Sequence, residues 1–139
     1  GQLIDDQSKI WLEQPDGTAD VINGGALAKE IWALESKPQL VVLASCQSAG
    51  AGGRSTDRGA LAALGPLLSE AGVPAVLAMQ GDVTMETVAA FMPVFFFAKL
   101  RETGLVDQAV AAARAAVAKR PDAWAPVLFM RLRDGLLWY

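Results

Sequence analysis

Four consecutive bulky apolar residues, Leu40 to Leu43, run directly into the small and polar sequence Ala44-Ser45-Cys46-Gln47-Ser48. A continuous apolar run of this length is typical of a strand that is buried on both faces, as in the parallel sheets of α/β proteins. In such sheets, ligands and catalytic groups gather at the carboxyl ends of the strands. Cys46 is the only cysteine and stands just beyond this strand. Its position therefore makes it a candidate nucleophile.

The rest of the chain alternates between helical and strand patterns. Apolar residues that recur every three or four positions predict four helices, and a second apolar run predicts another buried strand. The helices are expected at residues 26–34, 60–71, 84–101 and 105–119, and the strand at residues 73–79. Two hairpins are also predicted, one around Pro15-Asp16-Gly17 and one around Asp134-Gly135 near the end of the chain. The sequence thus predicts a three-layer α/β fold with a mostly parallel central sheet, helices on both faces and an antiparallel edge hairpin.

Length and composition restrict the organisation and the partners. With 139 residues, 53% of them hydrophobic, the chain can build one core but not two, so we expect residues 1–139 to form a single domain. A formal net charge of −3 argues against nucleic acid and against an anionic membrane as partners. The longest apolar run, Val88 to Ala98, is too short to span a bilayer, and Asp5 and Asp6 interrupt any signal-peptide pattern. Together with a single cysteine, these features lead us to expect a cytoplasmic protein.

The sequence around Cys46 also resembles a known family. An apolar strand that leads into Ser45-Cys46-Gln47-Ser48, a glycine-rich stretch, a helix of small residues and a second strand ending at Met79 resemble the CHAT family. The resemblance extends to the stretch Trp124-Ala125-Pro126-Val127. CHAT domains are caspase-like cysteine peptidase domains that are often attached to helical repeats. The resemblance therefore implies a caspase-like fold and peptide-bond hydrolysis with Cys46 as the nucleophile.

The resemblance also implies where the rest of the site lies. In this family the catalytic histidine stands immediately before a glycine, and this chain begins with Gly1 and contains no histidine. We therefore expect the histidine directly upstream of Gly1, and a domain that lacks its N-terminal strands. The loop Gln80-Gly81-Asp82 follows the second strand, so Cys46 should lie near this loop and near Gly1. By resemblance the loop walls the pocket for the residue preceding the scissile bond, where Asp82 would favour a basic side chain.

The predicted substrate-binding set is completed by Ser45 and Gln47, on either side of the cysteine. We predict no cofactor and no metal, because one cysteine and scattered carboxylates do not make a ligand set. The expected partners are a protein or peptide substrate and the remainder of the parent chain, including helical repeats. Two other interpretations stay open: a catalytically inactive scaffold in which Cys46 is simply a buried apolar residue, and a nucleotide-binding module that uses the loop from Gly50 to Gly59, where Arg54 stands in place of the P-loop lysine.

Overall fold

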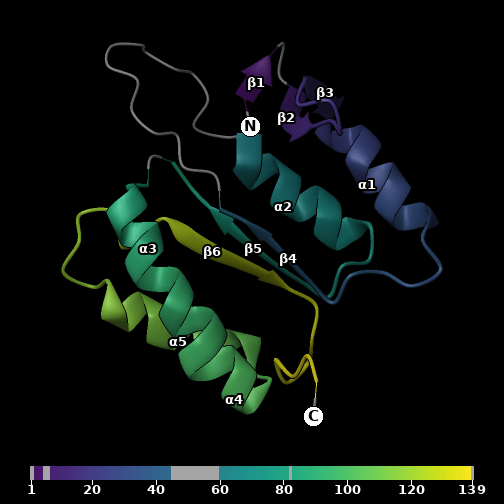
Figure 1. Ribbon diagram of the computed structural model, residues 1–139. Helices are drawn as coiled ribbons and strands as arrows, with labels where there is room; N and C mark the ends of the chain where they lie inside the picture. The colour runs from purple at the N-terminus through teal and green to yellow at the C-terminus, as the bar shows by residue number, and fades with distance from the viewer. Residues whose placement is uncertain (1, 5–6, 45–59, 82, 139) are drawn as a thin grey trace.

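The fold consists of two three-stranded sheets and a set of helices (Figure 1). It is known from a computed structural model, which describes residues 2–4, 7–44, 60–81 and 83–138. In chain order the elements are β1 (Gln2–Ile4), β2 (Gln7–Glu13), β3 (Ala19–Asn23), α1 (Gly24–Ala33), β4 (Leu40–Leu43), α2 (Ala60–Glu70), β5 (Ala75–Met79), α3 (Met85–Pro93), the π-helix η1 (Val94–Leu100), α4 (Arg101–Thr103), α5 (Val106–Ala116) and β6 (Pro126–Met130).

The central sheet has the strand order β4-β5-β6. β4 runs parallel to β5, with Leu40 opposite Ala75 and Leu43 opposite Ala78, whereas β6 runs antiparallel to β5. All five residues of β5 are buried, as expected for a strand covered on both faces. Within the described residues, β4 and β6 form the two edges of this sheet.

Successive side chains of β5 enter two different hydrophobic cores, because the side chains of a strand alternate between its faces. Val76 packs with Leu64 and Leu68 of α2 and with Ala28 of α1. Leu77, on the opposite face, belongs to the larger cluster that includes residues of α3, η1 and α5. Helices therefore cover both faces of the sheet (Figure 1), and the predicted three-layer α/β fold is confirmed.

The antiparallel edge strand is present as β6, but it does not belong to the predicted C-terminal hairpin. β6 pairs with β5, from Ala75 opposite Met130 to Met79 opposite Pro126. The chain does turn near Gly135, which has a φ of +73°, but Leu136 then forms a bridge with Leu105 instead of pairing with β6. β6 therefore pairs with the buried apolar strand β5 and not with the residues that follow the Asp134-Gly135 turn.

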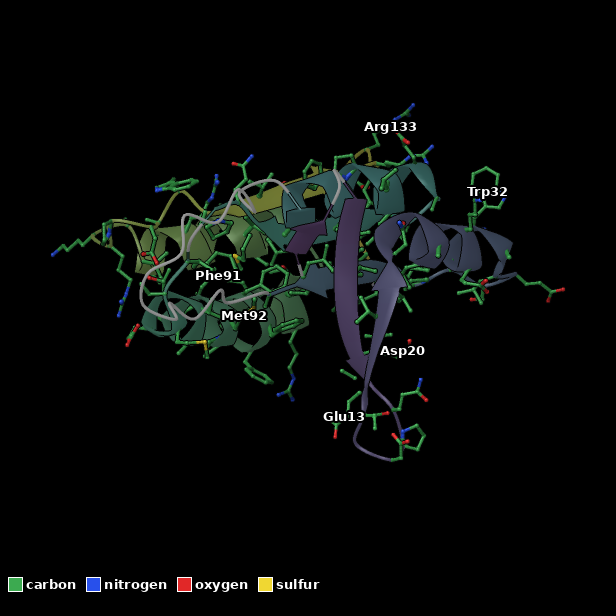
Figure 2. All side chains as sticks on the ribbon, turned by 90° about the horizontal axis from the view of Figure 1, so that it is seen from above. Glu13, Asp20, Trp32, Phe91, Met92 and Arg133 are labelled. Atoms are coloured by element: carbon green, nitrogen blue, oxygen red, sulfur yellow. The ribbon has the colours of Figure 1, made fainter. Side chains whose placement is uncertain are left out.

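The first sheet, β1-β2-β3, is antiparallel throughout. The predicted hairpin at Pro15-Asp16-Gly17 joins β2 to β3: Gly17 has a φ of +82°, and Asp16 Oδ1 accepts a hydrogen bond of 2.9 Å from the N–H of Thr18. Glu13 and Asp20 lie toward the free end of this hairpin, which projects from the rest of the molecule (Figure 2). β1, in contrast, was not predicted.

The helix boundaries follow local capping signals. Asn23 caps α1, its Oδ1 accepting a hydrogen bond of 2.7 Å from the N–H of Gly25. The helical segment predicted at residues 84–101 is present, but it changes character after Pro93, where the π-helix η1 begins. Pro93 has no N–H to donate, so the regular α-helical ladder is already interrupted at this point.

Candidate functional site

The carboxyl edge of the central sheet is the place where the sequence predicts a site. Because β4 and β5 are parallel and Leu43 lies opposite Ala78, the two strands end at the same edge. Met79 is the last residue of β5, and the exposed Gln80 follows it. The chain that leaves β4 and the chain that leaves β5 therefore start side by side, as the sequence predicts.

Several residues of the predicted site lie outside the described part of the chain. These are Gly1, Ser45, Cys46, Gln47 and Asp82, and the glycine-rich stretch from Gly50 to Gly59 lies outside it too. The predicted proximity of Cys46 to Gln80 and to Gly1 consequently stays a prediction. What the structure describes is the framework of the edge: the ends of β4 and β5, together with Gln80 and Gly81.

A third segment reaches the same edge from the other side of β5. β6 is antiparallel to β5, and its first residue, Pro126, lies opposite Met79. The residues that precede β6 are thereby delivered to the carboxyl end of β5, where the N–H of Gln80 donates a hydrogen bond of 2.7 Å to the carbonyl oxygen of Ala125. Figure 1 shows the loop between α5 and β6 and the start of α3 at this same end of the sheet.

Trp124 and Gly81 meet in this region. A Cβ atom placed on Gly81 would lie 2.7 Å from Cη2 of Trp124, closer than real contacts allow, so only glycine fits beneath the indole. The φ of Gly81 is +67°, a conformation that L side chains rarely adopt. The Trp124 side chain nevertheless remains 57% exposed, so its outer face is open to solvent.

Asp122 connects the same segment to the start of α3. Its side chain is only 6% exposed, and its carboxylate accepts three hydrogen bonds: from the N–H of Thr84 at 2.7 Å, from the hydroxyl of Thr84 at 2.9 Å and from the hydroxyl of Thr87 at 2.6 Å. The N–H of Thr84, followed by the hydroxyl of Thr87, lowers the pKa of Asp122 from 3.8 to about 2, against the opposing effect of burial. Asp122 is thus ionised at neutral pH and engaged in holding the loop.

This arrangement limits the chemistry that the described residues can perform. Asp122 is a poor proton acceptor near pH 7, since its pKa is depressed. The described residues contain no group of three or more His, Cys, Asp or Glu side chains that could bind a metal ion. The described residues of this edge therefore provide shape and rigidity.

Asp122, Thr84 and Thr87 were not predicted as residues of the site. Thr84 is the N-cap of α3, and its Oγ1 accepts a hydrogen bond of 3.3 Å from the N–H of Thr87. The spacing of Thr84 and Thr87 is a recognisable N-cap signal. No local signal links either threonine to Asp122, which belongs to a different segment of the chain.

Comparison with known protein families agrees with this framework. The model of the CHAT domain matches residues 2–131, from the first residue of β1 to the residue after β6. The chain belongs to the CHAT domain family. The matched range includes Cys46, Gln80, Gly81 and Trp124.

No curated protein and no solved structure matches the chain of this CHAT domain. The family assignment places the chain in a caspase-like, peptidase-related group and agrees with its α/β fold. No helix within the described ranges combines the length and the apolar character needed to cross a membrane.

Proposed function

We propose that this CHAT domain carries the nucleophile of a caspase-like cysteine endopeptidase, with Cys46 as the attacking group. One observation supports the proposal: β4, the strand that precedes Cys46 in the sequence, ends at the edge where the parallel strand β5 also ends and where the segment before β6 arrives. A thiol at a strand end is held by a rigid scaffold and faces the region where substrates bind in open α/β sheets. The CHAT family match supports the same chemistry.

In the proposed reaction, the Cys46 thiolate attacks the carbonyl carbon of the peptide bond, and backbone N–H groups bind the oxyanion that forms. A histidine has taken the thiol proton and gives it to the leaving amine, so the C–N bond breaks and a thioester remains. Water, deprotonated by the same histidine, then releases the acid and restores the thiol. The chain contains no histidine, and we propose that the residue directly before Gly1 is the catalytic histidine.

Residues around Cys46 and after β5 would bind the substrate in this proposal. Ser45 and Gln47 flank the nucleophile, and the Gln80–Gly81 turn forms a wall of the pocket. The Asp82 carboxylate would favour a basic side chain at the position preceding the scissile bond. The reaction needs neither a metal nor an organic cofactor.

The remainder of the parent chain is the partner that we propose for β4. Within the described residues β4 pairs on one side only, and all four of its residues are apolar and half-buried. Exposed edge strands usually carry charges or prolines that prevent pairing, and β4 carries neither. A strand from the residues that precede Gly1 would satisfy this edge, and helical repeats would adjoin the domain. A single free thiol suits the reducing environment of the cytoplasm.

A second candidate function is an inactive caspase-like scaffold, in which Cys46 would serve only as a small apolar residue, as lone cysteines commonly do. Iodoacetamide distinguishes the two candidates in the intact parent protein. An activated thiolate is alkylated rapidly at neutral pH, whereas a buried structural thiol is inert.

The decisive experiment compares the 139-residue chain with one extended upstream through the expected His-Gly pair. General acid–base assistance is worth roughly a hundredfold to ten-thousandfold, so we expect peptide hydrolysis from the longer chain and none from the shorter one. Cys46→Ala in the longer chain should abolish hydrolysis and leave the circular dichroism spectrum unchanged, while Cys46→Ser controls for the loss of the thiol alone. Turnover by the 139-residue chain itself, or activity that survives Cys46→Ala, would refute the proposal.

A further inference from the structure

Trp124 combines exposure with a fixed position at the candidate site. More than half of its side chain, 57%, is accessible to solvent, and its ring lies over the backbone of Gly81 at the end of β5. One face of the indole is thus supported by the protein and the other is available to a ligand.

The backbone on both sides of Trp124 is anchored. Before it, the Asp122 carboxylate accepts hydrogen bonds from Thr84 and Thr87 at the start of α3. After it, the carbonyl oxygen of Ala125 accepts the N–H of Gln80, and the guanidinium of Arg114 donates to the carbonyl oxygen of Pro126. A rigid aromatic side chain that is already ordered loses little entropy when a ligand packs on it, which makes it an effective binding group.

Three other exposed aromatic residues of the described chain, Trp32, Phe97 and Trp138, lack this setting. Trp32, which is 66% exposed, points away from α1 on the outside of the molecule (Figure 2). Phe97, which is 72% exposed, belongs to η1. Trp124, in contrast, lies at the sheet edge reached by the strand that precedes Cys46.

We propose that the indole of Trp124, supported by Gly81, forms an apolar subsite that packs against an apolar side chain of the polypeptide substrate. The inference rests on the proposed peptidase function and adds a substrate preference to it. An indole face supplies mainly apolar contact area, which suits an apolar side chain.

Peptide binding tests the subsite without requiring turnover. The probe is an array of degenerate hexapeptides, each with one fixed residue, presented to the chain carrying Cys46→Ala. We expect peptides with a fixed Leu, Met or Phe at one position to bind best, and Trp124→Ala to weaken their binding by roughly tenfold, the usual effect of losing an apolar pocket contact. Trp124→Phe should retain most of the binding, because an aromatic face remains.

Two further variants sharpen the result. Gly81→Ala should reproduce the loss, because the new Cβ would displace the indole while leaving it present. Trp32→Ala removes an equally exposed indole from α1 and should have no effect. Binding that is unchanged by Trp124→Ala, binding lost equally in Trp32→Ala, or no peptide bound at all would each overturn the inference.

The outcome separates the subsite from the peptidase proposal. Binding that depends on Trp124, without any cleavage that depends on Cys46 in the extended chain, supports the subsite and refutes the peptidase. Cleavage that depends on Cys46 and keeps its sequence preference in Trp124→Ala refutes the subsite alone. Thermal unfolding of each variant identifies loss of structure, and Gly81→Ala carries the test if Trp124→Ala fails to fold.

Discussion

Asp122 is the residue on which the described part of the site depends most. Its carboxylate draws together the loop before β6 and the first turn of α3 through three hydrogen bonds, two of them to Thr84. Hydrogen bonds to a charged group are stronger than those between neutral groups. The same hydrogen bonds that lower the pKa of Asp122 therefore hold the loop before β6 against the start of α3.

Asp122→Asn tests this role, because the amide keeps the size of the side chain but puts a donor either opposite the hydroxyl of Thr87 or opposite the N–H and hydroxyl of Thr84. We expect unfolding free energy at pH 7 to fall by about 1.5–3 kcal/mol, the usual worth of a hydrogen bond to a charged group. Urea denaturation of the variant measures this, with Asp20→Asn, on the exposed hairpin, as the control.

The contribution of Asp122 to the free energy of unfolding should depend on pH. The pKa of Asp122 in the folded state, about 2, is below its reference value of 3.8, so its stabilisation is complete above the reference value and is lost as the pH falls from about 4 to 2. The stability gap between the wild-type chain and Asp122→Asn should accordingly narrow across this range. A gap that is constant from pH 7 to pH 2 would contradict the assigned role.

At the scale of elements, α2 lies against the sheet at a position where no side chain fits. A Cβ atom on Gly65 would lie 2.4 Å from Cε2 of Phe129 in β6. Gly65 is buried, and its missing side chain allows helix and strand to approach closely. The contact fixes the separation between α2 and β6.

Gly65→Ala should therefore be destabilising, although alanine is ordinarily the better helix former by about 1 kcal/mol. Overpacking costs about 1–3 kcal/mol, which exceeds that gain, so we expect a net loss of about 1 kcal/mol. In a Phe129→Ala background the obstruction is gone, and Gly65→Ala should become neutral or stabilising. A double-mutant cycle measured by urea denaturation checks both values, and equal effects in the two backgrounds would exclude the contact as the cause.

The π-helix η1 distributes neighbouring phenylalanines between core and solvent. Phe95 is fully buried and its ring centroid lies 6.0 Å from that of Phe91, whereas Phe97 is largely exposed. Phe95→Ala should cost about 3–5 kcal/mol through cavity formation, while Phe97→Ala should change stability by less than about 0.5 kcal/mol. Thermal and urea unfolding of the two variants provide the comparison. Similar losses for both would mean that η1 is packed differently.

At the scale of the whole molecule, we expect the backbone amides of the central sheet to be the best protected from hydrogen exchange. Every residue of β5 is buried, whereas the residues from Leu12 to Val21, which include the hairpin turn, are exposed. Local stability follows burial and contact density. Hydrogen exchange followed by mass spectrometry should show the slowest exchange in β5 and the fastest among these described regions in the hairpin turn. Comparable rates in the two regions would contradict this ranking.

Much of this architecture follows from local patterns in the sequence. The apolar run Leu40–Leu43, the Asn23 cap and the Pro15-Asp16-Gly17 turn each contain within a few residues the physical reason for the element that they form. The same holds for the helix face of α5. The predictions based on these signals are confirmed, whereas the local Asp134-Gly135 turn signal does not produce the predicted hairpin, since Leu136 bridges to Leu105 instead.

Long-range choices are less visible in the sequence. The hydrogen bonds between Asp122 and Thr84 join two segments that share no pattern, and β6 selects β5 over the nearby residues beyond Gly135 because β5 offers a buried apolar surface. Trp124 could be noted in the sequence as part of the family resemblance, but its support by Gly81 depends on the sheet register. Such contacts depend on which segments the fold brings together, and a single sequence does not encode that locally.

The position of β6 next to β5 also matters while the protein is being made. Synthesis proceeds from the N-terminus, so β4 and β5 leave the ribosome well before β6, which follows α5. Until the chain has emerged through Met130, the side of β5 that pairs with β6 has no partner from this sheet. An unpaired apolar strand edge attracts other chains. Nascent chains of this domain should therefore be most prone to self-association, and most dependent on chaperones, in the interval between the emergence of β5 and that of β6.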